Sequence, residues 1–181
     1  MKVYTRRGDD GTTGLLYGGR VLKNAPAPMA YGSVDEAQAF IGLARAHAEP
    51  RGELDTLLVA VEHDLWVLMA ELATNPERRH KGTPGQSLVT TQMVTALEER
   101  IDDVMARFDA PTDFVVPGAN PLCAALDVAR TVVRRAEREV LSSAAEGSHV
   151  LPYLNRCSDL LWALARWQEG RSLLAKDVET S

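Results

Sequence analysis

The chain has 181 residues, of which 45% are hydrophobic and 25% are charged, and its formal net charge is -5. This length and composition predict one globular domain that can bury a core without disulfides or metal ions. The negative net charge excludes general affinity for nucleic acids and for anionic membranes, so a binding site for a polyanion would have to be local.

Sequence signals for membrane insertion or export are not evident. No apolar run approaches the roughly 20 residues that span a bilayer. The N-terminal stretch MKVYTRRGDD lacks the apolar core of a signal peptide. We therefore expect a cytoplasmic protein that has no membrane partner.

Residues 1–32 are rich in glycine and proline and show no helical periodicity. Glycines let backbone N–H groups come close to a ligand, which favours a loop that binds phosphate. Side chains that would suit a triphosphate belong to Thr5, Thr12, Thr13 and Lys23. The alternative is a pair of surface hairpin turns with Asp10 and Gly11 at one turn. A P-loop is excluded, because no Gly-Lys-Ser/Thr follows.

Apolar residues at spacings of three and four predict five amphipathic helices. The first is expected to begin at Ser33, which forms a capping box with Glu36, and to end before Pro50. Asp35 would then lie in the first turn, where a carboxylate complements the helix dipole. The other helices are expected at about 53–74, 90–108, 121–141 and 152–169. Short connections between them predict an all-α, up-and-down bundle.

Three segments outside the helices carry separate expectations. The polar segment 76–89 is predicted to be a mobile loop whose basic residues are solvated. Phe114 begins a short apolar run at a loop boundary, where a plug in the core is the default interpretation. Residues 171–181 are predicted to be a frayed tail.

The helix predicted at 121–141 carries a charged stripe beside its apolar one. Arg130, Arg134 and Glu137 lie within roughly a sixth of a turn, so their head groups should converge on one spot. Convergent guanidinium groups suit a polyanion. The same spacing also produces a solvated helix surface with salt bridges, which could meet an acidic protein as a helical interaction module. The helix alone leaves both interpretations open.

The cysteines and histidines do not predict a metal site. Cys123 and Cys157 lie in predicted helices among apolar neighbours and lack partners at metal-ligand spacing, so we expect reduced core cysteines. A di-iron bundle needs two Glu-x-x-His motifs. Glu146 with His149 fits that spacing, but Gly147 lies between them, so this interpretation is rejected.

Four segments of the chain carry recognisable motifs. In chain order they are YTRRGDDGTTGLLYGGRVLK, YGSVDEAQAFIGLARA, FVVPGANPLCAALDVARTVVRRAERE and YLNRCSDLLWALAR. Together they resemble the PduO-type ATP:cob(I)alamin adenosyltransferases, also called ATP:corrinoid adenosyltransferases, in order and in spacing. The resemblance covers nearly the whole chain. RRAER with a downstream LNRCSD behind GDDGTTG is specific in combination, although each piece alone is not.

The resemblance implies a homotrimer of five-helix bundles that holds ATP, with Mg²⁺, between neighbouring subunits. The reaction implied is transfer of the 5′-deoxyadenosyl group of ATP to a reduced Co(I) corrinoid, which gives adenosylcobalamin and triphosphate. The positions that match the ATP-binding pattern are Thr5, Arg6, Arg7, Gly8, Thr13, Gly14, Lys23, Arg134, Arg135, Ala136, Glu137, Arg138 and Asn155.

The resemblance further assigns catalytic roles to Arg134, Glu137 and Phe114. Because Co(I) is the nucleophile, the protein must supply alignment and neutralise charge on the leaving triphosphate. Phe114 is implied to occupy the lower face of the corrinoid and to keep the lower axial ligand off cobalt, which eases reduction of Co(II). Asp35 is implied to pair with Arg130 across the subunit boundary. The resemblance also implies two partner proteins, a flavin reductase and an enzyme that depends on adenosylcobalamin.

The chain departs from the family pattern at a few positions, which bear on the loop geometry around ATP. They are Ala27, Met29, Gln38, Ala119 and Cys157. An alternative with the same fold and sites is an ATP-gated carrier that delivers adenosylcobalamin to a client enzyme.

Overall fold

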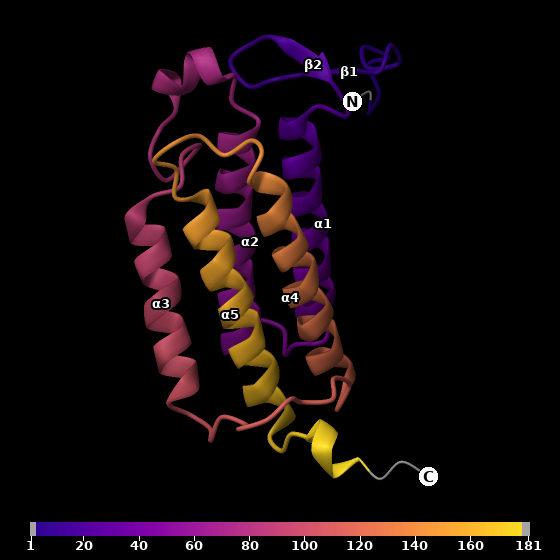
Figure 1. Cartoon of the computed structure of the whole chain (residues 1–181), viewed down its shortest axis with the longest axis vertical. Coiled ribbons are helices and arrows are strands. Elements are labelled where there is room, and N and C mark those ends of the chain that lie inside the picture. Colours follow the sequence, from indigo (N-terminus) through magenta and orange to yellow (C-terminus); the bar gives the residue numbers. More distant parts are fainter. Residues whose placement is uncertain (1–2, 179–181) are drawn as a thin grey trace.

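The computed structural model describes residues 3–178, which form a bundle of α-helices that run alternately up and down its long axis (Figure 1). The helices are α1 (Pro26–Ala46), α2 (Glu53–Leu72), α3 (Thr91–Met105), α4 (Pro121–Val140) and α5 (Val150–Glu169). Two 3-10 helices, η1 (Pro76–Lys81) and η2 (Ala175–Asp177), and an antiparallel hairpin of β1 (Thr12–Gly14) and β2 (Arg20–Leu22) complete the described part. The predicted helical bundle is confirmed, with a small sheet in addition.

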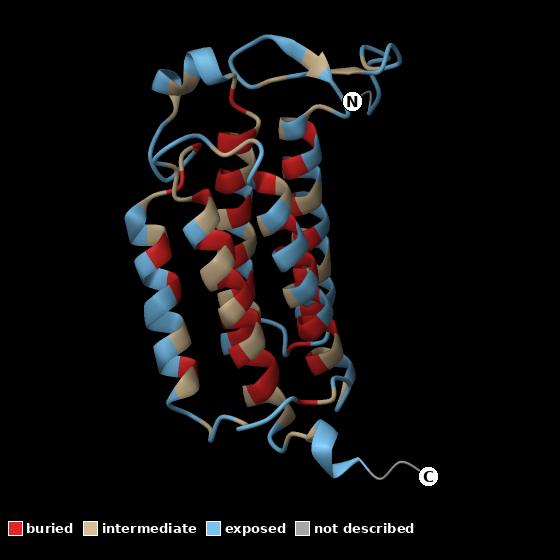
Figure 2. Cartoon of the chain, in the orientation of Figure 1, coloured by how far each residue is buried: buried red, intermediate tan, exposed pale blue. Residues whose placement is uncertain are grey.

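Helix α4 lies in the middle of the bundle, between α1 and α5. Helix α2 packs on α1 and also meets α5, where Tyr153 donates to Asp64 of α2 at 3.0 Å, and α3 packs on α5. The apolar stripe predicted for α4 faces the core, because its members are fully buried: Leu126, Ala129, Val133, Ala136 and Val140. Figure 2 shows buried residues on the inward faces of the α-helices. Each large apolar side chain buried in this way contributes about 1.5–3 kcal/mol.

The prediction for the start of the first helix was wrong. Helix α1 begins at Pro26, and Ser33 and Glu36 lie inside it, so they form no capping box. Proline is tolerated at this end, because the first turn of a helix leaves its N–H groups unpaired. Asp35 therefore lies in the middle of α1, where its side chain is exposed, and not in the first turn.

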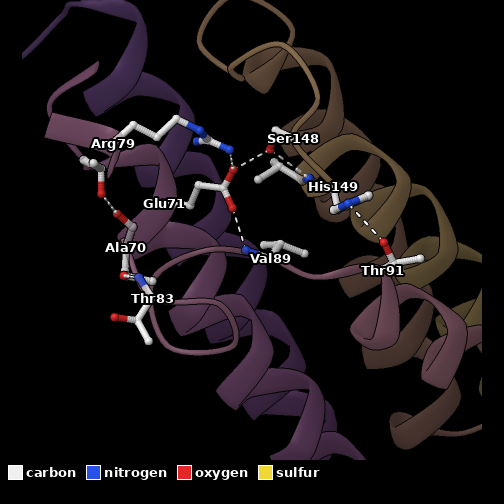
Figure 3. A network of polar contacts seen from close by, with 11 residues as sticks. Ala70, Glu71, Arg79, Thr83, Val89, Thr91, Ser148 and His149 are labelled. Atoms are coloured by element: carbon white, nitrogen blue, oxygen red, sulfur yellow. Dashed lines mark hydrogen bonds and ion pairs between the residues drawn. The ribbon is translucent and has the colours of Figure 1, made fainter. Parts of the chain in front are cut away.

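The carboxylate of Glu71, near the end of α2, joins several segments at one end of the bundle (Figure 3). It accepts hydrogen bonds from Arg79 Nη2 at 2.7 Å, from Ser148 Oγ at 2.6 Å and from the Val89 N–H at 2.5 Å. The segment 76–89 thus contains η1 and is tied to the bundle at Arg79 and Val89. The expectation that all its basic residues are solvated was wrong for Arg79, because Glu71 is buried and needs a cation.

Both cysteines are free and buried in the core, as predicted. Burial raises the pKa of Cys157 to about 12 and also raises the pKa of Cys123. The two thiols therefore stay protonated at neutral pH. Within residues 3–178, no helix is long and apolar enough to cross a membrane.

Removal of the Glu71 carboxylate should destabilise the protein. In a Glu71→Ala variant the buried Val89 N–H and the half-buried Ser148 hydroxyl lose their acceptor and Arg79 loses its counterion, so the free energy of unfolding should fall by about 3 kcal/mol. Urea unfolding followed by circular dichroism measures this loss. The control is Glu98→Ala, which removes an exposed ion pair with Arg156 and should cost less than about 1 kcal/mol. Equal losses for both variants would contradict the role of Glu71.

Candidate functional site

The glycine-rich N-terminal segment forms a loop followed by the β1–β2 hairpin. Thr13 and Gly14 lie in β1, and Lys23 follows β2, where its N–H donates to the carbonyl oxygen of Gly11 at 2.9 Å. A Cβ atom at Gly8 would lie 3.2 Å from Lys23 Nζ. The hairpin therefore brings the ammonium group of Lys23 against the backbone of the loop, as a phosphate-binding loop requires. Thr5, Arg6 and Arg7 are exposed in the same loop.

Arg20 holds the loop in shape, a role that the sequence analysis missed. Its Nη2 donates to the carbonyl oxygen of Arg7 at 2.5 Å, and its Nε donates to Thr12 Oγ1 at 2.9 Å. The hydroxyl and the N–H of Thr12 both donate to Asp10, and these bonds lower the pKa of the Asp10 carboxyl. The hydroxyl of Thr12 is thus used within the loop. A hairpin register that pairs Gly14 with Arg20 places Thr12 two residues along on the same face, so it could have predicted the contact between Arg20 and Thr12.

Asn75 fastens the hairpin to the end of α2. Its Nδ2 donates to the carbonyl oxygen of Gly18 at 2.9 Å, and its N–H donates to the carbonyl oxygen of Leu16 at 3.1 Å. Its Oδ1 accepts from the N–H of Glu77 and so caps η1. Gly19 has a φ of 92°, and a Cβ atom there would lie 2.9 Å from Asn75 Nδ2. Only glycine fits this contact without strain.

Helix α4 presents its arginines at the surface. Arg135 pairs with Glu36 of α1, and Arg138 Nη1 donates to the carbonyl oxygen of Arg134 at 3.0 Å. Arg134 makes no ion pair with any residue in 3–178, so its guanidinium group is available to a ligand. Ala136, by contrast, is fully buried, so its side chain offers no surface to a ligand.

Among residues 3–178, no hydrogen bond or ion pair joins the head groups of Arg130, Arg134 and Glu137 to one another. Glu137 instead accepts a hydrogen bond from Asn155 Nδ2 of α5 at 3.1 Å. Arg130 Nε lies 3.3 Å from Asp127 Oδ1, one turn earlier on the same helix. Arg130 and Glu137 are thus held by their own neighbours, whereas Arg134 is not, and the stripe divides into an upper part at Arg134 and a lower part at Arg130.

A hollow of about 380 Å³ lies at the lower part, between the α3–α4 connection and the helices α4 and α5. Phe114 and Arg130 both line it, as do Asp127, Trp162 and Arg166. Phe114 and Arg130, two of the three residues that the resemblance places on the corrinoid side, thus line one hollow. The third, Asp35, makes no ion pair with Arg130 or with any other cation within residues 3–178.

Three buried charged side chains in or next to the wall of this hollow were not predicted, those of Asp127, Arg166 and Glu169. Asp127 Oδ2 accepts from Arg166 Nη2 at 2.6 Å, while Asp127 Oδ1 faces Arg130. Arg166 Nε also lies 3.0 Å from the buried Glu169. Asp127 therefore orients the guanidinium group of Arg130 from below. The only signal in the sequence was the spacing of three residues between Asp127 and Arg130.

Phe114 is 77% exposed, so the expectation of a core plug was wrong. Its neighbour Val115 lies opposite Leu174 in an antiparallel bridge. Side chains alternate between the two faces of extended backbone, so Val115, which is 7% exposed, points inward and Phe114 points outward. The tail prediction was also wrong for the residues up to 178, because they include this bridge and η2; residues 179–181 lie outside the described part.

The hairpin and the arginines of α4 remain separate in one chain. The hairpin lies across the end of the bundle, and the loop before it projects past the start of α1 (Figure 1). No hydrogen bond or ion pair among residues 3–178 joins this loop to Arg134, Arg135 or Arg138. One chain thus presents two cationic surfaces that it does not bring into contact.

A family model described as cobalamin adenosyltransferase matches residues 3–168. The chain belongs to the cobalamin adenosyltransferase family. It is 42% identical over 170 residues to the corrinoid adenosyltransferase of Mycobacterium tuberculosis, with 91% of this chain and 87% of that protein covered. It is 39% identical over 173 residues to the corrinoid adenosyltransferase PduO of Salmonella typhimurium, where 94% of this chain spans 50% of that protein.

Solved structures of the same family share the fold. The chain is 29% identical to a phenylalanine-to-histidine variant of a PduO-type ATP:corrinoid adenosyltransferase from Lactobacillus reuteri complexed with cobalamin and ATP, with a TM-score of 0.86 and 97% of both chains covered. An arginine-to-lysine variant from the same organism, complexed with ATP, gives a TM-score of 0.82 at 30% identity, with 95% of this chain and 99% of that chain covered.

Loss of the Asn75 side chain should loosen the hairpin of this cobalamin adenosyltransferase family member. Asn75→Ala removes the bond to Gly18, which contributes about 1 kcal/mol, so trypsin should cleave after Arg20 about fivefold faster. Timed digestion with mass spectrometry measures the rate.

The matched control for this digestion is Asn24→Ala, an exposed asparagine in the same segment. It should digest as the parent protein does. If Asn75→Ala digested at the parent rate as well, the hairpin would be held by other contacts.

Proposed function

We propose that this protein transfers the 5′-deoxyadenosyl group of ATP to the cobalt of a reduced corrinoid, and so forms adenosylcobalamin and triphosphate. The observation that carries the proposal is the overlap of 97% of the chain with a relative complexed with cobalamin and ATP. The curated relatives named as corrinoid adenosyltransferases support the same activity.

In this reaction Co(I) attacks the 5′ carbon of ATP, the carbon–oxygen bond breaks, and its electron pair leaves with triphosphate. The protein must therefore align the two substrates and neutralise the leaving group. We assign these tasks to Arg134 and Glu137, because Arg134 has no ion pair among residues 3–178 and Glu137 is positioned by Asn155. The remaining contacts to ATP are proposed for Thr5, Arg6, Arg7, Gly8, Thr13, Gly14, Lys23, Arg135, the backbone of Ala136, and Arg138.

We propose that Mg²⁺ accompanies the nucleotide. Within residues 3–178, no group of three or more His, Cys, Asp or Glu side chains could hold a metal ion. Mg²⁺ commonly binds through substrate phosphates and water, with few protein ligands, so the triphosphate would supply most of its coordination. The chain's own contribution is then the positive charge of Lys23 and of the α4 arginines.

The hollow beside Phe114 is proposed to receive the lower face of the corrinoid. The exposed ring of Phe114 supplies an apolar surface that cannot coordinate cobalt. A ring at this place would keep the lower axial ligand away and make Co(II) easier to reduce. A flavin reductase would deliver the electron, and an enzyme dependent on adenosylcobalamin would take the product.

The complete site is proposed to form between subunits of a homotrimer, each a single domain. The loop of one chain would meet the arginines of its neighbour, since the two surfaces do not meet within one chain. Asp35 and Arg130 would pair across the same boundary; Asp35 is exposed on α1 and makes no ion pair within residues 3–178. Heterologous contacts of this kind form a closed ring when the rotation between neighbouring subunits closes, as it does in a trimer with threefold symmetry.

Replacement of Arg134 should abolish most of the activity. The loss of one donor to the leaving group costs about 10²–10³ in rate, by analogy with the loss of an oxyanion-hole donor. An anaerobic absorbance assay with chemically reduced cobalamin, Mg²⁺ and ATP measures conversion of the Co(I) spectrum. Arg134→Ala should be slower by that factor, and Arg100→Ala on α3 should match the parent protein.

The same assay separates the proposed function from its rivals. A parent protein that binds ATP and adenosylcobalamin but leaves the Co(I) spectrum unchanged would be a carrier. A parent protein that binds no ATP would rule out both the enzyme and the carrier.

A further inference from the structure

A C-terminal strap, residues 172–177, runs beside the segment that carries Phe114. The N–H of Ala175 donates to the carbonyl oxygen of Phe114 at 2.8 Å. The N–H of Val116 donates to the carbonyl oxygen of Leu173, also at 2.8 Å. These two bonds bracket the bridge between Val115 and Leu174. Figure 1 shows the strap at the end of the bundle where the α3–α4 connection passes.

Side chains fix both ends of this pairing. Lys176 Nζ lies 3.1 Å from Asp113 Oδ2, and Asp113 Oδ1 accepts the N–H of Phe114 at 2.8 Å. At the other end, Ser172 Oγ donates to the carboxylate of Glu169 at the end of α5. The strap therefore connects the backbone of Phe114 to the rigid helix α5 by a short path.

The ring of Phe114 itself has little to hold it. It is 77% exposed, whereas the next residue, Val115, is 7% exposed. A side chain in such a place takes its position from its backbone, because it lacks the neighbours that would lock it. The backbone at Phe114 is in turn held by Ala175 and by Asp113.

We propose that the strap is a positioning element for Phe114, and that Ala175 sets the place of the ring through its N–H bond to the Phe114 carbonyl oxygen. The inference rests on the proposed function, in which Phe114 keeps an axial ligand off cobalt. The strap lies beyond residues 3–168, which match the family model, so the match assigns it no role. Its effect is confined to the step in which Co(II) must lose that ligand before it is reduced.

Ala175→Pro removes this one donor with little other change. Ala175 is the first residue of η2, and Leu174 before it has φ -83° and ψ 139°. Proline fits the first position of a helical turn, and an extended residue before it is the conformation that proline favours. The matched control is Ala175→Ser, which keeps the N–H at the same place.

The test compares two assays on the parent protein and both variants. The first assay contains Co(II) cobalamin, ATP and reduced flavin as the electron donor, and here the turnover of Ala175→Pro should fall about fivefold. This factor corresponds to the loss of one net hydrogen bond, because about 1.36 kcal/mol changes a rate tenfold. With cobalamin already reduced to Co(I), its turnover should match the parent, and so should its KM for ATP. Ala175→Ser should match the parent protein in both assays.

Electron paramagnetic resonance of bound Co(II) with ATP gives an independent readout. The nitrogen coupling of an axial ligand should reappear in Ala175→Pro and stay absent in the parent and in Ala175→Ser. If Ala175→Pro behaved as Ala175→Ser does in every measurement, or lost both activities equally, the strap would have no positioning role. If the parent protein itself did not convert Co(I), the proposed function would fail instead.

Discussion

The structure depends on one constraint on α4. One face of this helix must pack in the hydrophobic core, while the other face carries arginine side chains at the surface. Its buried stripe, which includes Leu126, Ala129 and Val133, fixes the rotation of the helix between α1 and α5. That rotation carries Arg134 outward, where it has no ion pair with any residue in 3–178, and leaves Arg130 over the buried Asp127. The helix thus holds the guanidinium groups of Arg134 and Arg130 in fixed places, the first without an ion pair within residues 3–178 and the second next to Asp127.

Different contacts anchor the loops at the two ends of the bundle, and these loops carry residues proposed to bind the two substrates. At one end Glu71 and Asn75 fasten loops to α2, and the hairpin with Lys23 extends from there. At the other end the strap supports the segment around Phe114, and the buried Arg166 holds Asp127 of α4. Adenosyl transfer needs an anion-binding surface and an apolar surface that are fixed in relation to each other. A rigid bundle with anchored ends supplies both.

Most of the fold followed from periodicity, because α2 to α5 each bury a regular apolar stripe. The start of α1 did not, since Pro26 and Gly32 are typical of loops. Proline is nevertheless tolerated in the first turn of a helix, and the fully buried Ala30 and Val34 anchor this end of α1 in the core. The arginines and Phe114 were found through a specific combination of motifs. Contacts between distant segments could not be found in this way: Asp127 with Arg166, and the bridge that turns Phe114 outward, depend on pairings that leave no local pattern.

The central claim is that loop and arginines from neighbouring chains build one site. The most direct test co-expresses Lys23→Ala and Arg134→Ala subunits under different tags and measures adenosyl transfer by the purified mixed trimers. Each variant alone should be nearly inactive, yet every mixed ring of three chains has one boundary at which an intact loop meets an intact Arg134, so about a third of the parent activity should return. If the mixed trimers stayed as inactive as the two variants, the site would lie within one chain and the account would be wrong.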